Sequence, residues 1–349
     1  MKRSILTLTL SLCLLTAAVA NAQMKNALGA LAVSPDNKLL LAAGVNRVLY
    51  EVNPETLEVT NRHYINMLAN EMYFSNDGGS VVVVTGESKV AILNPGDWKH
   101  KADIESVADV AIASEADKMV VLHRTRYDRE KRFSPIAIYE MSTGKKLKEV
   151  SLEIQGEAIG VSPDASTIVL LSQGQKDESE PKEQAPRELR DLERDQFDQT
   201  HDGYSSEVVW LDGELNQTAR NATYYQGRGT HGFVVSAEQA QFIVYDNECV
   251  KFSPDGSTEL FRTAISYNYG IGTSNDAQKV VTGGLGDGMI MNMQDMTSVK
   301  FQIARMPGYP EYFYGFTFGP DGSIYGGTNA FRVIKLSADG EVLKEQPIF

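Results

Sequence analysis

Asp109, Glu157 and His231 are the side chains of this sequence best placed to do acid–base chemistry together. Each stands five residues before a serine that recurs in a repeated turn. Equivalent positions of a repeat occupy equivalent places in the fold, so we expect the three side chains to lie on a common ring. Two carboxylates and an imidazole in one site could move protons or hold a cation.

The same position in the other copies of the repeat is mostly polar or aromatic. It is occupied by Gly29, Asn70, Tyr269 and Tyr314. If these residues surround the mouth of a central channel, they form a ligand-binding ring. The alternative is that junctions between loops and strands are polar in any protein. The predicted ligand-binding residues are Asn70, Asp109, Glu157, Arg228, His231, Tyr269 and Tyr314.

Further aromatic side chains gather in the last three copies of the repeat. Tyrosine combines an apolar ring with a polar tip, and it is favoured where a protein grips a ligand or partner. We therefore expect an aromatic patch on one side of the ring, although packing between repeats would also explain it. Its members would be Tyr224, Tyr225, Tyr267, Tyr309, Tyr312 and Phe313.

The elements that position these residues are read from the repeat itself. In the first copy an apolar run ends at Ser34-Pro35-Asp36, and two more apolar runs follow before Asn53-Pro54-Glu55-Thr56. The first-turn anchor occurs seven times, roughly 40 residues apart except for one interval of 74 between Ser162 and Ser236. Four short strands at this period predict an all-β fold, a seven-bladed β-propeller of four-stranded blades.

This blade pattern resembles the YVTN and WD40-like propellers. That group includes the lactonase-type propellers and the large subunit of periplasmic amine dehydrogenases. The matching features are the Ser-Pro-Asp turns and third-strand endings such as Ile138 to Lys145. The resemblance implies a seven-bladed propeller but no particular activity, because propellers host unrelated functions. A regular pair of Gly-His and Trp-Asp in each blade, typical of WD40 proteins, is missing.

Two unequal loops interrupt the regular pattern. Residues 173–206 form a charged insertion in blade four, and Gly174 to Gly203 holds ten acidic and five basic residues, a net charge of −5. Within it, Pro186 to Gln199 is predicted to form a short helix. Blade three has a basic loop, which we expect to pair with the insertion over the mouth. The predicted partner-binding residues are Arg124, Arg126, Arg129, Leu189, Leu192 and Phe197.

The first 22 residues predict export. Lys2 and Arg3 precede an apolar run from Ile5 to Leu15, and small residues lead to Ala22, which is the order of a secretory signal peptide. Residues 23–349 would then form one periplasmic or secreted propeller domain, monomeric and without a membrane span. The formal net charge of −13 argues against nucleic acid as a partner.

No motif for a cofactor is recognised, and five scattered histidines make a metal site unexpected. Our leading hypothesis is a non-catalytic scaffold that binds a protein partner or small molecule at the channel mouth. One alternative is a lactonase-like hydrolase using Asp109, Glu157 and His231, with Arg228 binding an acidic substrate. A second alternative, an accessory subunit of a periplasmic redox enzyme, rests on the resemblance alone.

Overall fold

The computed structural model describes residues 27–129, 131–173, 186–188, 206–223, 232–235, 241–244, 248–253, 259–264 and 269–348. These residues form strands and turns and include no helix, so the predicted all-β class is confirmed for them. No helix in these segments could cross a membrane. The predicted signal peptide, residues 1–22, lies outside them. Of the predicted helix in the insertion, only residues 186–188 are described, and they form a turn.

The described strands form seven antiparallel sheets, six of four strands and one of five. The first comprises β1 (Ala30–Val33), β2 (Leu40–Ala43), β3 (Val48–Val52) and β4 (Val59–Tyr64). The second comprises β5 (Ala69–Phe74), β6 (Val81–Thr85), β7 (Lys89–Leu93) and β8 (His100–Glu105). The third comprises β9 (Val107–Ala113), β10 (Lys118–His123), β11 (Arg126–Asp128), β12 (Lys131–Glu140) and β13 (Lys146–Leu152).

The remaining sheets repeat the four-stranded pattern. The fourth comprises β14 (Gln155–Val161), β15 (Thr167–Gln173), β16 (Ser206–Asp212) and β17 (Gln217–Thr223). The fifth comprises β18 (Gly232–Val235), β19 (Gln241–Val244), β20 (Glu248–Phe252) and β21 (Glu259–Ala264). The sixth comprises β22 (Gly270–Thr273), β23 (Lys279–Gly283), β24 (Asp287–Asn292) and β25 (Ser298–Gln302). The seventh comprises β26 (Phe313–Phe318), β27 (Ile324–Thr328), β28 (Arg332–Leu336) and β29 (Val342–Pro347).

The turn between the first two strands of a sheet follows from its Ser-x-Asp sequence. The Ser34 hydroxyl donates a 2.7 Å hydrogen bond to Asp36 Oδ1. The backbone N–H of Leu39 donates a hydrogen bond to Ser34 Oγ at 3.0 Å. Ser75 and Asp77 form the same bond at 2.6 Å. These side chains replace backbone partners that a tight turn leaves unsatisfied, which is why the motif recurs at the same place in the repeat.

The turn between the third and fourth strands of four sheets carries an apolar side chain, which is buried in three of them. Leu57, Trp98, Leu215 and Met296 all adopt positive φ angles, between 55° and 62°. A bulky residue rarely adopts this conformation. Here burial compensates, because Leu57 is completely buried and packs in a cluster that includes residues of the seventh sheet. The turns of Leu57, Trp98 and Leu215 therefore fasten their sheets to a neighbour.

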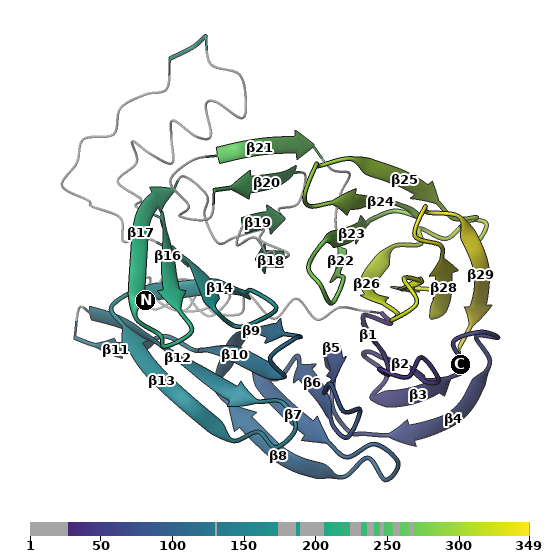
Figure 1. Ribbon diagram of the computed structural model, residues 1–349. Helices are drawn as coiled ribbons and strands as arrows, with labels where there is room; N and C mark the ends of the chain where they lie inside the picture. The colour runs from purple at the N-terminus through teal and green to yellow at the C-terminus, as the bar shows by residue number, and fades with distance from the viewer. Residues whose placement is uncertain are drawn as a thin grey trace, which may run out of the picture.

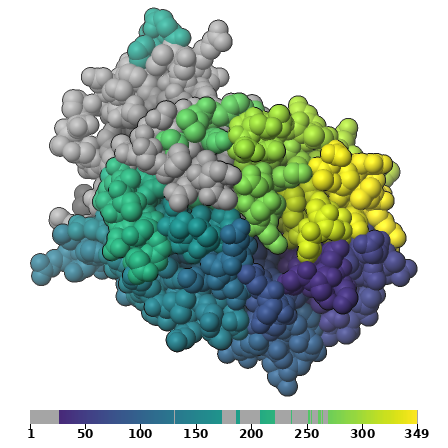
Figure 2. Space-filling view, viewed as in Figure 1, coloured from purple at the N-terminus to yellow at the C-terminus, as the bar shows by residue number. Residues whose placement is uncertain are grey.

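The seven sheets lie around a common centre (Figure 1). Apolar clusters fill the seams between consecutive sheets from the first to the fifth and between the sixth and seventh. The fifth sheet contacts the sixth through Lys251, whose Nζ donates to the Met293 carbonyl at 2.9 Å. The first and last sheets lie side by side, purple and yellow in Figure 2. There Tyr325 donates a 3.2 Å hydrogen bond to the Pro54 carbonyl. No strand is shared across this seam, so side-chain and backbone contacts join the described ends.

Glycines allow the innermost strands to approach closely. A Cβ atom on Gly315 would lie 1.8 Å from the Gly29 carbonyl oxygen, and one on Gly270 would lie 2.9 Å from the Gly315 backbone nitrogen. Both distances are shorter than van der Waals contact. Glycines are thus required at positions 270 and 315, where β22 and β1 approach β26.

Candidate functional site

The described residues of the predicted ring lie at one face of the molecule, which we call the mouth face. Consecutive strands of each sheet are antiparallel, so alternate connections lie on opposite faces. The innermost strands are β1, β5, β9, β14, β18, β22 and β26, and the mouth face holds the described residues of the connections that lead into them. It also holds the described connections between the second and third strands, including the described ends of the predicted insertion, Gln173 and Ser206.

Three of the predicted ring residues are the extra residue of a β-bulge. In β5 the register passes from Ala69 to Glu71, which leaves Asn70 without an opposite residue. Glu157 in β14 and Tyr314 in β26 are left out of the register in the same way. A bulge bends its strand and re-aims a side chain, and bulges are common at the rims of closed β structures. At the mouth face, equivalent positions of three sheets thus carry a side chain that takes no part in the regular pairing of strands.

Asp109 has a structural task at the seam between the third and fourth sheets. Its Oδ2 accepts a 2.9 Å hydrogen bond from the backbone N–H of Ile159 in β14, and its Oδ1 accepts one of 2.9 Å from Val110. Asp109 also contributes, after burial and Glu71, to raising the pKa of the Tyr73 hydroxyl. Its carboxylate thus holds two neighbouring innermost strands together, a role that the sequence did not reveal.

Glu157 lies on the neighbouring innermost strand and is half-buried. Its Oε2 atom is buried, and Gln155 Nε2 lies 3.5 Å from its Oε1. The other two residues predicted to work with it, Arg228 and His231, lie outside the described residues. Asp109 and Glu157 therefore occupy adjacent strands at the mouth, while the proposed carboxylate–imidazole arrangement stays a prediction.

The predicted aromatic residues of the sixth and seventh sheets do come together. The rings of Tyr269 and Tyr314 stack with centroids 5.8 Å apart, and Tyr312 meets Tyr269 edge-on at 5.2 Å. Burial, followed by the neighbouring phenols of Tyr269, Tyr312 and Tyr309, raises the pKa of the Tyr314 hydroxyl. Of the other predicted members of the aromatic patch, Phe313 is completely buried among Phe301 and Phe316, and Tyr224, Tyr225 and Tyr267 lie outside the described part of the chain.

Apolar side chains extend this cluster over the surface. Leu285 is 38% exposed, Met306 and Tyr309 are each 46% exposed, and Tyr269 is 38% exposed. The turn that carries Leu285 is bonded to the β25–β26 connection on both sides, through Phe313 N to Gly284 O at 3.0 Å and Ile303 N to Gly286 O at 2.9 Å. We call this surface the tyrosine platform, consisting of Tyr269, Leu285, Met306, Tyr309, Tyr312 and Tyr314.

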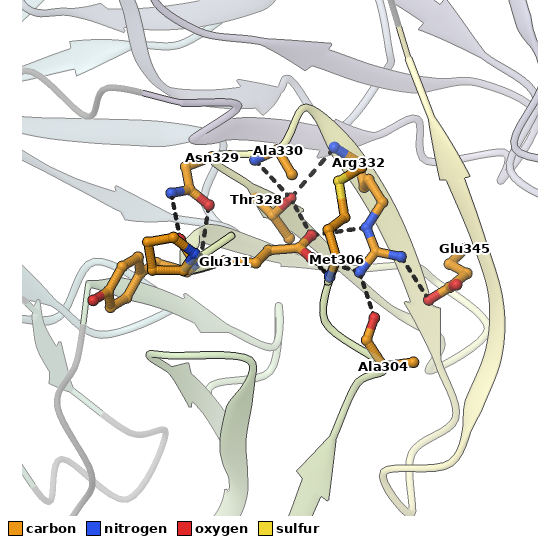
Figure 3. A network of polar contacts seen from close by, with 10 residues as sticks. Ala304, Met306, Glu311, Thr328, Asn329, Ala330, Arg332 and Glu345 are labelled. Carbon is orange, nitrogen blue, oxygen red and sulfur yellow. Dashed lines mark hydrogen bonds and ion pairs between the residues drawn. The ribbon is translucent and has the colours of Figure 1, made fainter. Parts of the chain in front are cut away.

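A buried ion pair holds the platform in place (Figure 3). Glu311 is completely buried and precedes Tyr312 directly. Its Oε1 accepts from Arg332 Nε at 2.8 Å, and its Oε2 accepts from Arg332 Nη2 at 2.7 Å. Burial raises the pKa of the Glu311 carboxyl, but hydrogen bonds from Arg332 and Thr328 more than offset it, so the pKa lies below its usual value.

The rest of the network fixes both ends of the β25–β26 connection. Glu311 Oε2 also accepts the N–H of Met306 at 3.2 Å, and Arg332 Nη2 donates to the Ala304 carbonyl at 2.9 Å. Asn329 Oδ1 accepts a 2.8 Å hydrogen bond from the backbone N–H of Tyr312. The exposed rings are therefore presented on a rigid base. Sequence analysis missed this base, because nothing in the sequence distinguishes Glu311 from the many exposed carboxylates.

The predicted basic loop of the third sheet is a β-hairpin formed by β11 and β12 at the mouth face, with Arg126 and Arg129 exposed. Arg124 donates to the Ser88 hydroxyl and Arg132 to Gln155 in the next sheet. The three remaining predicted partner-binding residues, Leu189, Leu192 and Phe197, lie outside the described residues. Pairing between the hairpin and the insertion therefore stays a prediction.

Turns on the face opposite the mouth reach one another across the molecule. The Ser114 hydroxyl of the third sheet donates to the Asn275 carbonyl of the sixth sheet, although 161 positions separate them. Glu115 N donates to the Pro163 carbonyl of the fourth sheet at 2.9 Å. These contacts narrow the centre on that face, so the mouth face is the better approach for a partner.

The described residues contain no group of three or more histidine, cysteine, aspartate or glutamate side chains that could hold a metal ion. Comparison of the chain with models of known protein families and with curated protein sequences finds no match. The site must therefore be interpreted from its own chemistry.

Proposed function

We propose that this protein is an exported, seven-bladed β-propeller that acts as a binding scaffold in the periplasm. Seven similar antiparallel sheets around one centre, with contacts between the first and last, support the propeller assignment. The resemblance to YVTN and WD40-like propellers and the apparent signal peptide support the family and the location.

The tyrosine platform is the observation on which the binding function rests. Tyrosine and methionine are enriched at protein interfaces, and rings that are fixed before binding lose little conformational freedom when a partner arrives. Four platform side chains are at least 38% exposed, yet the connection beneath them is fastened by the buried pair of Glu311 and Arg332. A surface that is both apolar and rigid is costly in water unless something covers it.

The hydrolase hypothesis receives less support from the described geometry. Each carboxylate oxygen of Asp109 already accepts a backbone N–H at 2.9 Å. A general base needs a lone pair directed at substrate or water. Asp109 is therefore better explained as a bridge between strands, and none of the contacts among the described residues bears on the redox-subunit alternative.

Photo-cross-linking from the platform tests the binding function. We would place benzoylphenylalanine at Met306 in the full chain and irradiate it in cells that export the protein. We expect discrete adducts that disappear in a Tyr269→Ala/Tyr309→Ala background, because the anchoring rings are lost. The control position is Tyr64, which is 71% exposed on the outer strand β4. Equal adducts from positions 306 and 64, or adducts that survive the double substitution, would refute the proposal.

A further inference from the structure

Ionised side chains are distributed unequally between the described turns of the two faces. On the face opposite the mouth, six of the seven first turns carry an aspartate, four of them within a Ser-x-Asp motif. The first-turn aspartates are Asp36, Asp77, Asp117, Asp164, Asp276 and Asp321. These aspartates contribute to the formal net charge of −13 of the whole chain.

Among the described connections of the mouth face and the β11–β12 hairpin, cations outnumber carboxylates. Glu87 pairs with Arg47 at 3.4 Å and Glu153 with Lys131 at 3.0 Å. A surface with excess positive charge attracts and orients an acidic partner. The carboxylates there are Glu87, Asp128, Glu153, Glu188 and the buried Glu311, and the cationic side chains are Arg47, Arg124, Arg126, Arg129, Lys131, Arg132, Arg187 and Arg305.

Arg305 brings this charge to the edge of the tyrosine platform. It is exposed, and its Cγ and Cδ atoms lie 2.5 Å from where a Cβ on Gly286 would stand, so it crosses the turn that carries Leu285. In the described connections 284–286 and 303–312 the only carboxylate, Glu311, is completely buried and paired. The platform thus offers apolar rings beside one exposed guanidinium.

We infer that the tyrosine platform binds an acidic segment of a partner protein, in which apolar side chains lie next to carboxylates. The apolar side chains cover the exposed rings of Tyr269 and Tyr309, and a carboxylate pairs with Arg305. Guanidinium and carboxylate form the strongest hydrogen-bonded ion pairs available to side chains. This inference rests on the proposed binding function and names the chemistry of the partner.

A displayed library of random dodecapeptides, selected on the full-length protein, tests the inference. We expect enrichment of peptides that combine aspartate or glutamate with aromatic, leucine or proline residues. A labelled synthetic peptide of the enriched sequence should bind about tenfold more weakly to the Tyr309→Ala variant. Binding to Arg305→Glu should weaken similarly, and a peptide with lysine at the acidic positions should recover it. Lys145→Glu, in the exposed turn between β12 and β13 on the opposite face, changes the net charge by the same amount and is the matched control.

The outcomes separate the two proposals. Loss of binding in Tyr309→Ala without any effect of Arg305→Glu would leave the binding platform standing and overturn the acidic partner. Failure to enrich any peptide, or equal affinity for native protein and both variants, would overturn both. A thymidine dodecanucleotide that displaces the peptide from native protein would identify nucleic acid as the occupant instead. Peptide binding that is lost when residues 176–200 are deleted would place the site on the insertion and also refute the inference.

Discussion

Individual side chains at the mouth divide into those that build the site and those that face a partner. Both Asp109 and Glu311 carry carboxylates that accept internal hydrogen bonds. Backbone N–H groups donate to Asp109, and the guanidinium of Arg332 donates to Glu311. Tyr309 and Met306 have no comparable internal role and are each 46% exposed. These two carboxylates therefore provide structure, and Tyr309 and Met306 provide contact surface.

Replacing Glu311 with glutamine should lower the free energy of unfolding by about 3 kcal/mol, because it leaves the buried Arg332 without its main counter-charge. Urea denaturation of the full chain measures this. The control is Glu153→Gln, whose pair with Lys131 is exposed and should contribute less than about 1 kcal/mol. Equal losses in the two variants would contradict the structural role of Glu311.

The same pair predicts a pH dependence of stability. The folded-state pKa of Glu311 lies below its ordinary value of 4.5, so the pair stabilises the protein above that pH. This stabilisation is lost as the pH falls through the folded-state pKa. The difference in unfolding free energy between native protein and Glu311→Gln should therefore narrow as the pH falls below 4.5. A constant difference down to pH values where the native protein still folds would contradict this.

At the scale of a single sheet, the turns determine how it meets its neighbour. The turn before β4 places Leu57 at a φ angle of 56° and buries it completely against the seventh sheet. The strands supply most of the hydrogen bonds, whereas this side chain fixes where the sheet packs. Conformational strain in the turn is accepted because the burial outweighs it.

Leu57→Ala should therefore destabilise the protein by about 2–5 kcal/mol, since it opens a cavity in the seam. Thermal unfolding followed by circular dichroism would measure the loss. Leu147→Ala serves as the control, because Leu147 is 46% exposed on the outer strand β13 and should change stability little. A Leu57→Ala protein as stable as the control variant would show that the turn does not fasten the seam.

At the scale of the whole molecule, the first and last sheets join without sharing a strand. Backbone segments approach there at glycines, and the Cβ of any other residue at position 315 would collide with the Gly29 carbonyl oxygen at 1.8 Å. Integrity of the ring thus depends on close packing at a few positions. The tyrosine platform lies beside this seam, because its Tyr314 directly precedes Gly315. A change in packing at the seam should therefore also affect binding at the platform.

Gly315→Ala should lower the free energy of unfolding by about 1–3 kcal/mol through overpacking at this seam, and urea denaturation checks it. It should also reduce cross-linking from position 306, because Tyr314 must shift with its neighbour. Gly86→Ala is the control, since its Cβ would meet nothing closer than Asn70 Oδ1 at 3.5 Å. If Gly315→Ala unfolds at the same urea concentration as the native protein, the close approach is not required.

The sequence alone determined the strands, their repeat and the places of the turns. Ser34 and Asp36 form their turn through bonds within a few residues, and local chemistry of this kind is readable from local sequence. The lopsided aromatic patch was also predictable, because Tyr269 and Tyr314 occupy the same repeat position.

Only the tertiary structure decided which of these residues are committed to structure. The bond between Asp109 and Ile159 spans 50 positions and that between Glu311 and Arg332 spans 21. Whether a carboxylate is buried and paired depends on neighbours brought by other sheets, and the pattern of residue types within one repeat does not encode them. For the same reason, the net charge of the chain was known from the sequence, while the face on which each described turn lies required the fold.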